Sequence, residues 1–390
     1  MKTIFFTPKF HPDPNYYIND VVFDINLGEK IVITGKTEGE SIFKFVKYVE
    51  DIKIYLIPYF RRSNNSLFSL FLEYLTFFLS SFIFIPIILF IEKPQSIVHY
   101  GISPPLYGLP IIFLKPVLKY KYIFWLQDIW PESVFTRIKR NKIIFSTLEL
   151  MMSFFYKFSD VIPSSVDILT EPRFCPYKNK LAFLPQGYKR SLKNESRNSQ
   201  AEKIIESIKN ETRKVIIYAG NISNSMFLDE FSDGVESLKD KVCFYMIGDG
   251  PLKKQISNKK LSGTHIYEFL SRDKIVEVIA EADFAYIGRE TNLETEIISK
   301  VIPGKFALYC LAKTPIVSLS SGYLNAFIKS SKVGISSSSL KKEDIRNLLE
   351  ELLVLDNDKI EGMKKNQGSI YSEMFDHEKV LKKIKEFIIL

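Results

Sequence analysis

The chain has 390 residues, which is too long for one ordinary hydrophobic core and suits two domains. It is 46% hydrophobic and 25% charged, a globular composition that argues against intrinsic disorder. The formal charge of +8 favours an anionic partner, such as a nucleotide, a lipid phosphate or a membrane surface. The sequence carries no zinc-finger, RNA-recognition or helix-turn-helix signature, so nucleic acid is not the expected partner.

Apolar runs alternate with polar or helical segments through the first half of the chain. This rhythm is typical of a parallel sheet with helices on both faces. The expected strands are Ile4 to Thr7, Lys30 to Thr34, Lys53 to Pro58, Ser96 to Tyr100, Tyr122 to Leu126, Asp160 to Ile162 and Leu181 to Leu184.

One apolar segment stands out within this half. The residues from Leu75 to Ile91 include no charge and approach the length of the shortest membrane spans, although Pro86 interrupts them. We favour a helix that is buried or lies on a membrane surface. A true span and an exposed patch that docks a partner are the alternatives.

A charged stretch separates this half from a second series of strands. Residues 188–213 are nearly free of aromatics and are predicted to form a linker and a surface helix. A second Rossmann-like domain is predicted over 214–370, after a first one over 1–187, and a C-terminal helix over 371–390 can pack back on the first domain. The expected strands of the second domain are Lys214 to Ala219, Val242 to Ile247, Thr264 to Phe269, Phe284 to Gly288 and Pro315 to Ser318.

Cysteine usage and the first residues indicate the compartment. Cys175, Cys243 and Cys310 are far apart, without C-x-x-C spacing or nearby histidines, so neither a disulfide framework nor a zinc site is indicated. The first residues lack the apolar core and cleavage site of a signal peptide. A cytoplasmic protein is therefore expected.

Polar residues gather after one of the predicted strands, in the stretch FWLQDIWPES. Gln127, Asp128 and Glu132 follow the apolar run Tyr122 to Leu126. In open α/β sheets ligands bind at the carboxyl ends of the strands. By contrast, Asp356-Asn357-Asp358 lies between two amphipathic segments, so we predict a turn and a helix cap there, with no metal.

The stretch FWLQDIWPES resembles the strand-and-turn signature of family 4 retaining glycosyltransferases that build bacterial O-antigen, capsule and similar polysaccharides. The likeness extends along most of the chain, through segments whose order and spacing match the family. These segments are Phe5 to Pro12, Ser103 to Leu106, Ala219 to Asn221, Ile247 to Pro251, Ala282-Asp283 and Pro303 to Val317.

This resemblance implies an α/β fold of the GT-B type, with two Rossmann-like domains whose parallel sheets face a central cleft. The first domain would bind the acceptor and the second the nucleotide sugar. The implied reaction is a retaining, metal-independent transfer of a sugar from a nucleotide sugar, expected to be UDP-linked, to a lipid-linked saccharide. It needs no cofactor and takes place at the cytoplasmic face of the inner membrane, with which the protein would associate peripherally.

The donor site follows from the charge that the leaving diphosphate develops, which fixed cations and backbone N–H groups must neutralise. Lys305 follows Pro303 and Gly304 at the start of a predicted helix, and such a helix end with an added cation forms an anion site. A solvated surface lysine is the alternative. The resemblance implies that the other diphosphate-binding residues are Arg289, with Lys300 as a weaker rival, Gly220, Asn221 and Gly304.

The nucleotide is expected beside the next strand ends. Gly248 and Gly250 flank Asp249 after a predicted strand, in a turn that lines the nucleotide pocket of family members. An ordinary strand-to-helix turn is an equal alternative. Tyr267 and Glu268 resemble the edge that holds the base through main-chain groups.

On the acceptor side, Asp128 is the predicted catalytic carboxylate, which takes or orients the proton of the acceptor hydroxyl. A cap for the following helix is the alternative for Asp128. His11, Ser103 and Glu132 are placed on the same side. A histidine near a strand end, such as His11 or His99, is more often structural than catalytic.

Three positions depart from the family pattern. Leu308 stands where relatives carry a glutamate that holds the ribose, Lys313 stands in place of a glycine, and Gln186-Gly187 replaces Asn-Gly. The candidates to replace the missing carboxylate are Glu290, Glu294 and Glu296. Because of these departures, a non-catalytic GT-B partner subunit or a glycan-binding protein is an alternative to a glycosyltransferase. A nucleotide-sugar 2-epimerase is the third hypothesis.

Overall fold

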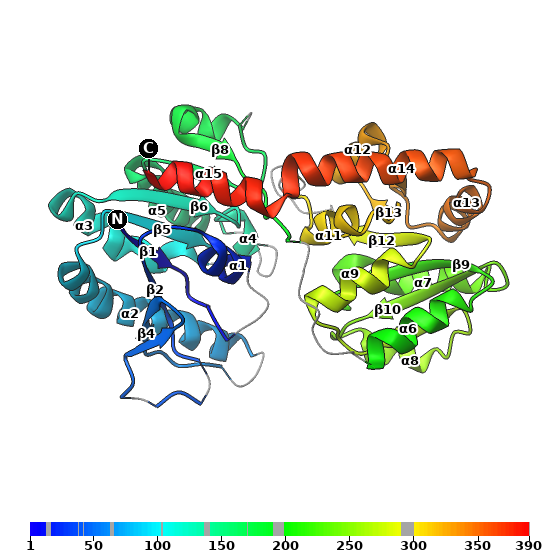
Figure 1. The fold of residues 1–390 in the computed structure, drawn as a ribbon, viewed down its shortest axis with the longest axis horizontal. Helices are drawn as coiled ribbons and strands as arrows, with labels where there is room; N and C mark the ends of the chain where they lie inside the picture. The colour runs from blue at the N-terminus through cyan, green and yellow to red at the C-terminus, as the bar shows by residue number, and fades with distance from the viewer. Residues whose placement is uncertain are drawn as a thin grey trace. The chain divides into compact units, whose positions relative to one another are not determined.

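The computed structural model describes residues 1–12, 17–37, 39–41, 43–62, 66–102, 104–135, 141–169, 171–189, 199–289 and 300–389 (Figure 1). The chain divides into two compact units. Unit 1 comprises Met1–Gln186 and Glu378–Leu390, and unit 2 comprises Gly187–His377. Each unit has a mainly parallel sheet between helices, so the predicted α/β architecture with two Rossmann-like sheets is confirmed.

The sheet of unit 1 has the strand order β3-β4-β2-β1-β5-β6-β7-β8 and is parallel except for β3. Its strands are β1 (Lys2–Phe6), β2 (Glu29–Gly35), β3 (Val46–Val49), β4 (Ile52–Ile57), β5 (Ser96–Gly101), β6 (Lys121–Leu126), β7 (Ile162–Ser164) and β8 (Leu181–Phe183). The prediction missed β3, whose side chains are partly or fully exposed, because it lacks a buried apolar run. It also placed β7 two residues too early.

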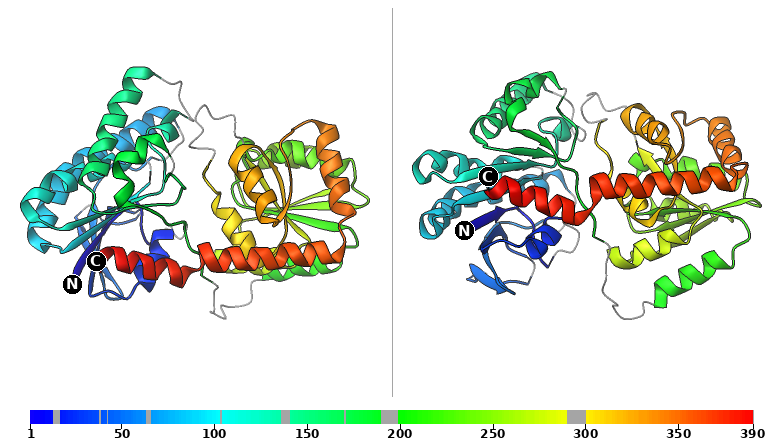
Figure 2. Two further views of the ribbon diagram at one scale, coloured as in Figure 1. Left: turned by 90° about the horizontal axis from the view of Figure 1, so that it is seen from above. Right: turned by 45° about the horizontal axis from the view of Figure 1, so that its top comes forward.

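Helices cover both faces of this sheet (Figure 2). They are α1 (Tyr17–Asp24), α2 (Leu67–Glu92), η1 (Pro105–Gly108), α3 (Leu109–Leu118), α4 (Glu132–Phe135), α5 (Lys142–Phe158), η2 (Pro172–Lys180) and α15 (His377–Ile389). Side chains alternate between the faces of a strand. Phe5 therefore packs in one core with α1 and α15, and its neighbour Phe6 points to the other face, which carries α5. The terminal helix begins at His377 rather than at residue 371.

The sheet of unit 2 is entirely parallel, in the order β11-β10-β9-β12-β13-β14. The strands are β9 (Lys214–Ala219), β10 (Val242–Ile247), β11 (Thr264–Tyr267), β12 (Phe284–Arg289), β13 (Ile316–Ser320) and β14 (Gly334–Ser337). Chain order reverses between β9 and β12, and such a switch point is where open α/β sheets bind ligands. The prediction missed β14, because its sequence GISS has no apolar run.

The helices of unit 2 are α6 (Ser199–Lys209), η3 (Asn224–Met226), α7 (Leu228–Glu236), α8 (Lys253–Asn258), α9 (Arg272–Ala280), α11 (Gly304–Ala312), α12 (Gly322–Ser331), α13 (Lys342–Leu353), α14 (Asn357–Ile370) and the π-helical turn η4 (Tyr371–Phe375). Ala201, Ile204 and Ile208 of α6 are buried in a core of unit 2, so this helix belongs to the domain and is not only a surface helix beside a linker. Asp356 caps α14 by accepting the Lys359 N–H at 2.8 Å, as the prediction of a helix cap requires.

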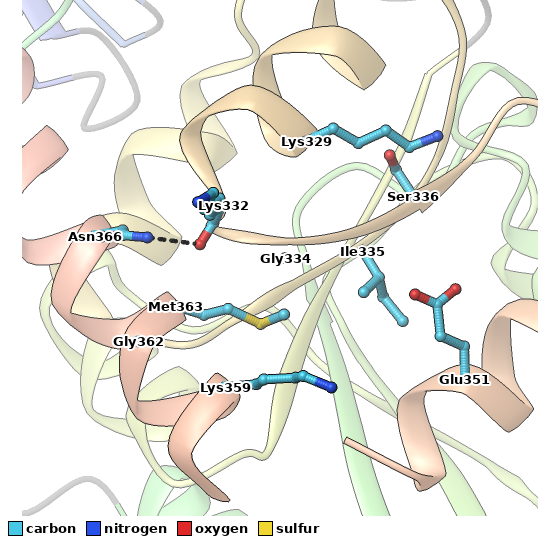
Figure 3. Close-up of a pocket in the computed structure, with 10 residues that line it drawn as sticks. All are labelled: Lys329, Lys332, Gly334, Ile335, Ser336, Glu351, Lys359, Gly362, Met363 and Asn366. Atoms are coloured by element: carbon cyan, nitrogen blue, oxygen red, sulfur yellow. Dashed lines mark hydrogen bonds between the residues drawn. The ribbon is translucent and has the colours of Figure 1, made fainter. Parts of the chain in front are cut away.

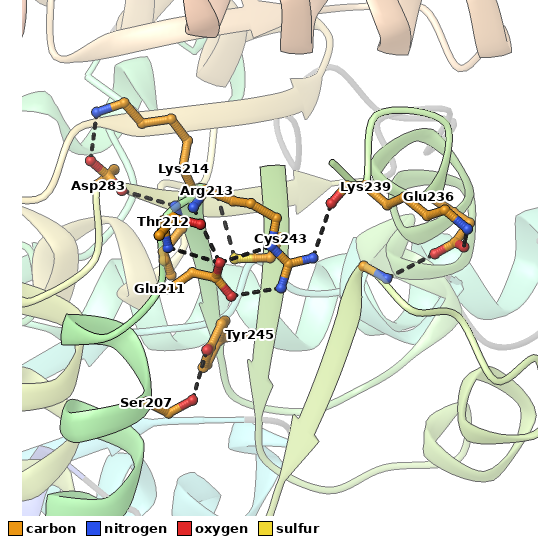
Figure 4. A network of polar contacts seen from close by, with 12 residues as sticks. Ser207, Glu211, Thr212, Arg213, Lys214, Glu236, Lys239, Cys243, Tyr245 and Asp283 are labelled. Carbon is orange, nitrogen blue, oxygen red and sulfur yellow. Dashed lines mark hydrogen bonds and ion pairs between the residues drawn. The ribbon is translucent and has the colours of Figure 1, made fainter. Parts of the chain in front are cut away.

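Two features lie at the edge strand and the amino edge of this sheet. A hollow of about 520 Å³ borders the edge strand β14, lined by Lys329, Lys332, Ser336, Glu351 and Lys359 among others (Figure 3). The amino edge is closed by a polar network (Figure 4). In this network, Asp283 accepts the Val215 N–H at 2.9 Å and pairs with Lys214, and Glu211 pairs with Arg213 at 2.6 Å.

Candidate donor site

The carboxyl ends of β9 and β10 meet in direct backbone contact. Gly220 follows β9 with a φ of +135°, and its N–H donates to Ile247 O at 2.9 Å. Gly248 follows β10 with a φ of +149°, and a Cβ there would lie 2.0 Å from Gly220 O. Both positions require glycine, for conformation and for space. The predicted glycines therefore bring two strand ends together at the switch point.

The next residues of these two loops hold each other in place. Ile222 N–H donates to Asp249 O at 2.8 Å, and Gly250 N–H donates to Asp249 Oδ1 at 2.8 Å. A Cβ at Gly250 would lie 2.6 Å from Asn221 Oδ1. The structure thus brings together all five of the predicted residues that lie between Gly220 and Gly250.

Lys305 lies over these loops from the first turn of α11. Pro303 is the N-cap of α11, so Lys305 belongs to the first turn of the helix, where N–H groups without a helical partner are found. A Cβ on Gly220 would lie 2.5 Å from Lys305 Cε, which places the lysine stem directly on the Gly220 backbone. The Nζ atom lies 5.2 Å from the centroid of the Tyr218 ring.

The half-buried Lys305 side chain has no partner of opposite charge among the described residues. Within the described part of the chain it has no hydrogen bond or ion pair, and burial lowers its pKa from 10.5 to about 8. An unpaired buried cation is costly, because burial removes water that is not replaced. A bound anion would supply the missing partner, so the surroundings of Lys305 suit an anion, and its role at the donor diphosphate stays a prediction.

Tyrosines fix the position of α11 against the sheet. Tyr309 accepts the Ala219 N–H at 3.3 Å and donates to Tyr286 O at 3.1 Å, so its hydroxyl joins α11 to β9 and β12. Tyr218 donates to Asn221 O at 2.5 Å, and a Cβ on Gly304 would lie 2.6 Å from the Tyr188 hydroxyl. Sequence reasoning missed these residues, because aromatic side chains in apolar strands and helices resemble ordinary core residues.

Arg289 lies on the other side of the switch point, at the end of β12. Its Nη1 donates to Val301 O at 2.5 Å, and burial lowers its pKa to about 10. This bond fixes the segment that leads into α11. The structure therefore gives Arg289 a positioning contact beside the loop that presents Gly304 and Lys305.

The predicted base-binding residues follow the next strand, β11. Tyr267 O accepts the Gly248 N–H at 3.1 Å, which links this strand end to the glycine turn. The Tyr267 ring stacks on Tyr245, with centroids 5.6 Å apart. Glu268 is exposed and pairs with Lys253 at 2.6 Å. These residues continue one row of strand ends from β12 to β11.

The acceptor-side residues belong to unit 1. Asp128 lies half-buried after β6, and its N–H donates to Gly101 O at 3.3 Å. Ile129, Trp130 and Pro131 separate it from α4, which begins at Glu132, so Asp128 does not directly precede that helix. Its catalytic role stays a prediction.

The neighbours of Asp128 are engaged in structural contacts. Gln127 Oε1 accepts from Gln186 Nε2 at 2.8 Å. Glu132 is buried and pairs with Arg173 at 2.6 Å, so its carboxylate is partly occupied. The prediction that Glu132 faces the acceptor therefore competes with a structural role that the sequence did not indicate, because Arg173 lies far along the chain.

The histidines near strand ends differ in their surroundings. His99 is buried among aromatic rings, Nδ1 lies 2.7 Å from Tyr122 Oη, and burial lowers its pKa to about 3. It is a core residue. His11 lies at the surface of unit 1 with its ring 5.7 Å from Phe23. Ser103 lies outside the described residues.

The departures from the family pattern have clear structural consequences. Leu308 is 9% exposed and packs in a core of unit 2, where a glutamate would need a polar partner. Lys313 ends α11 with a φ of 55°, the left-handed conformation that favours glycine. Glu290, Glu294 and Glu296 lie outside the described residues. No group of three or more His, Cys, Asp or Glu side chains that could hold a metal ion occurs among the residues that the structure describes.

Comparisons with known proteins agree with this architecture. No protein-family model matches the chain, and no curated protein matches it in sequence. WaaG, a glycosyltransferase involved in lipopolysaccharide biosynthesis, superposes with a TM-score of 0.66 at 13% identity, over 99% of each chain. HepE of Anabaena, in complex with UDP, gives 0.70 at 13% identity over 99% of each chain. Sucrose-phosphate synthase of Thermosynechococcus elongatus gives 0.71 at 10% identity, over 99% of this chain and 97% of the other. The chain therefore has the GT-B fold.

Proposed function

We propose that this protein is a glycosyltransferase that takes its sugar from a nucleotide sugar, with UDP as the nucleotide. The observation that carries the proposal is Lys305, a half-buried ammonium without a counter-charge among the described residues, held over Gly220 at the start of a helix. Similar structures support the choice of nucleotide. HepE binds UDP and UDP-glucose, and a trehalose-6-phosphate protein of E. coli binds UDP-2-fluoro glucose.

The chemistry follows from the charge of the leaving group. When the bond to the sugar breaks, the diphosphate gains negative charge, and preorganised cations and N–H groups stabilise it without moving. Lys305 and the amino end of α11 supply these groups, and the Arg289 contact holds the segment before them. This set needs no metal ion, and we propose a metal-independent reaction.

The finer parts of the proposal rest on the resemblance to family 4. They are retention of the sugar configuration, a lipid-linked saccharide as acceptor, and a role in bacterial surface polysaccharide assembly at the cytoplasmic membrane face. Asp128 would take or orient the acceptor proton. The structural similarity to WaaG, described for lipopolysaccharide biosynthesis, agrees with this class of acceptor.

A second candidate is a GT-B partner subunit that binds a glycan without catalysis. Leu308 favours it, because a buried leucine cannot replace the hydrogen bonds that the family glutamate is implied to make with the ribose. A 2-epimerase remains the third candidate, and it would change the nucleotide sugar without any acceptor.

The test is incubation of the purified chain with radiolabelled UDP-sugars and a lipid extract of bacterial membranes, with and without EDTA. The proposal predicts labelled lipid and released UDP that require the extract, resist EDTA and retain the anomeric configuration by NMR. Nucleotide binding without any product would favour the partner subunit. An altered nucleotide sugar in the absence of lipid would favour the epimerase.

A further inference from the structure

The outer surface of unit 1 carries an apolar helix that its own core does not cover. α2 buries one side, including Phe77, Ile85 and Leu89, and exposes the other. With 26 residues at 1.5 Å per residue it is about 39 Å long. The outward side chains that are at least half exposed are Phe68, Phe71, Leu79, Ile83, Ile87, Phe90 and Ile91.

The apolar surface continues from α2 onto α3, and α5 is bonded to α3. The rings of Phe82 and Phe113 lie 6.3 Å apart and are both exposed, which joins the outer side of α2 to that of α3. Lys115 of α3 donates to Phe158 O of α5 at 2.7 Å. The exposed α5 residues Ile143, Leu150 and Phe154 follow helical spacing and form a further stripe. We call the exposed side of α2, α3 and α5 the apolar face.

Single exposed apolar residues are ordinary, but a contiguous surface of this kind marks an interaction site. α2 is long and apolar enough to cross a membrane by length and composition. Its inner side is nevertheless fixed to unit 1. The next question is therefore which partner the outer side meets.

The charged residues on and around the apolar face indicate which kind of partner it fits. The acidic residues of α2 are both buried and paired: Glu92 with Lys53 at 2.6 Å and Lys2 at 2.8 Å, and Glu73 with Arg62 at 3.2 Å. In the described residues of the three helices and their caps, the exposed charged side chains are lysines, apart from Glu149, which is 43% exposed and lies 3.7 Å from Arg173. The exposed lysines are Lys93, Lys119, Lys142 and Lys157.

This distribution matches an anionic lipid surface. Apolar side chains enter the boundary of the acyl chains while flanking cations meet the headgroups. The lysines lie at the ends of the helices, where long side chains can reach outward from an apolar surface. The helix cannot leave unit 1 to cross a bilayer without breaking the Glu92 and Glu73 ion pairs and exposing its buried side.

We propose that the apolar face docks unit 1 on an anionic bilayer, with α2 lying in the plane of the membrane surface rather than across it. The evidence for docking does not depend on the proposed function, but the biological purpose that we give to docking rests on that function. α2, α3 and α5 each join two parallel strands, so their amino ends lie at the carboxyl edge that carries Asp128. A lipid-linked acceptor would therefore approach that edge from the membrane.

The test is flotation of the purified full chain with vesicles of phosphatidylcholine, with or without phosphatidylglycerol. We compare Ile83→Glu with Phe113→Glu, and use Val354→Glu of unit 2 as the control, because Val354 is an exposed apolar residue outside the face. We expect the chain to float only with phosphatidylglycerol. Each variant on the face should bind about tenfold more weakly, and the control should be unchanged.

Other outcomes overturn the proposal. Flotation that ignores both substitutions, or no flotation at all, would show that the face does not dock on lipid. Resistance to alkaline extraction from membranes would indicate a span. A dimer in solution that Ile83→Glu dissociates, without vesicle binding, would assign the face to a second copy of the chain. Retained UDP binding in every variant would separate a failure of docking from a failure of the proposed function.

Discussion

The two sheets end in different ways at their carboxyl edges. In unit 2 the edge is built from glycines that bring the backbone of β9 and β10 together, under a lysine without a counter-charge. In unit 1 the residues after β6 are engaged with their neighbours, since Gln127 Oε1 accepts a hydrogen bond from Gln186 and Glu132 is paired with Arg173. The comparison shows that unit 2 holds a cation in a fixed position that suits an anion, whereas the edge of unit 1 leaves Asp128 as its main candidate for chemistry.

Asp128→Asn tests the contribution of unit 1 and has the largest expected effect. If Asp128 takes or orients the acceptor proton, turnover should fall by about 10² to 10⁴. The affinity for UDP should not change, because the donor residues lie in unit 2. The measurement is transfer rate and UDP affinity side by side, with Asp51→Asn, at the amino end of β4, as the control. Unchanged turnover would make Asp128 structural.

Glu132→Ala tests whether its neighbour is structural. Removing the buried partner leaves Arg173 with only Glu149, at 3.7 Å, so the free energy of unfolding should fall by about 1 to 3 kcal/mol. Urea unfolding of Glu132→Ala, Arg173→Ala and the double variant measures this. The double variant should lose less than the sum. Lost turnover with unchanged stability would instead place Glu132 at the acceptor.

Lys305→Met tests how much the Lys305 charge lowers the free energy of unfolding. Removing this charge should raise the free energy of unfolding at neutral pH by about 1 kcal/mol while weakening UDP binding by at least about tenfold. In the unchanged protein, the unfolded chain holds more protons between pH 8 and 10.5, so the free energy of unfolding rises with pH across that window.

The affinity for UDP should fall as the pH rises, whereas the free energy of unfolding should increase. Above a pH of about 8 the Lys305 ammonium loses its proton, so UDP binding weakens as the pH rises. Titrations from pH 7 to 9 check this, and the slope should vanish in Lys305→Met. The same slope in the variant would assign the titration to another group.

Lys313→Gly has the smallest expected effect. Glycine adopts the left-handed conformation without the cost of a Cβ, so the free energy of unfolding should rise by about 1 kcal/mol. Lys329→Gly, inside α12, should lower it by a similar amount. Thermal unfolding of the two variants checks the opposite signs, and a loss of stability in Lys313→Gly would contradict the account.

The sequence was sufficient for most of the fold but not for the contacts of the site. Strands such as β9 and β10 were predictable because buried parallel strands are continuous apolar runs. β3 and β14 were not, since exposed or glycine-serine strands lack that signal. Lys305 and Gly220 were recognisable from the family resemblance and from helix-start chemistry.

The periodicity of the sequence could not predict contacts between residues that are distant in the chain. The stem of Lys305 rests on Gly220, and Tyr309 bonds to two strands, but nothing local in the sequence marks either contact. The ion pair of Glu132 depends on Arg173 of η2, which only the fold brings near. The same holds for the apolar face, because its contribution from α5 depends on how the helices pack.

The central claim is that unit 2 binds a nucleotide diphosphate through Lys305. Calorimetric titration of the purified chain with UDP tests it most directly, with Lys305→Ala beside Lys300→Ala as the rival lysine. The account predicts that UDP binds, that Lys305→Ala loses at least about tenfold in affinity, as expected for a charge-assisted hydrogen bond, and that Lys300→Ala does not. Equal binding by Lys305→Ala and the unchanged chain, or no binding of UDP at all, would contradict it.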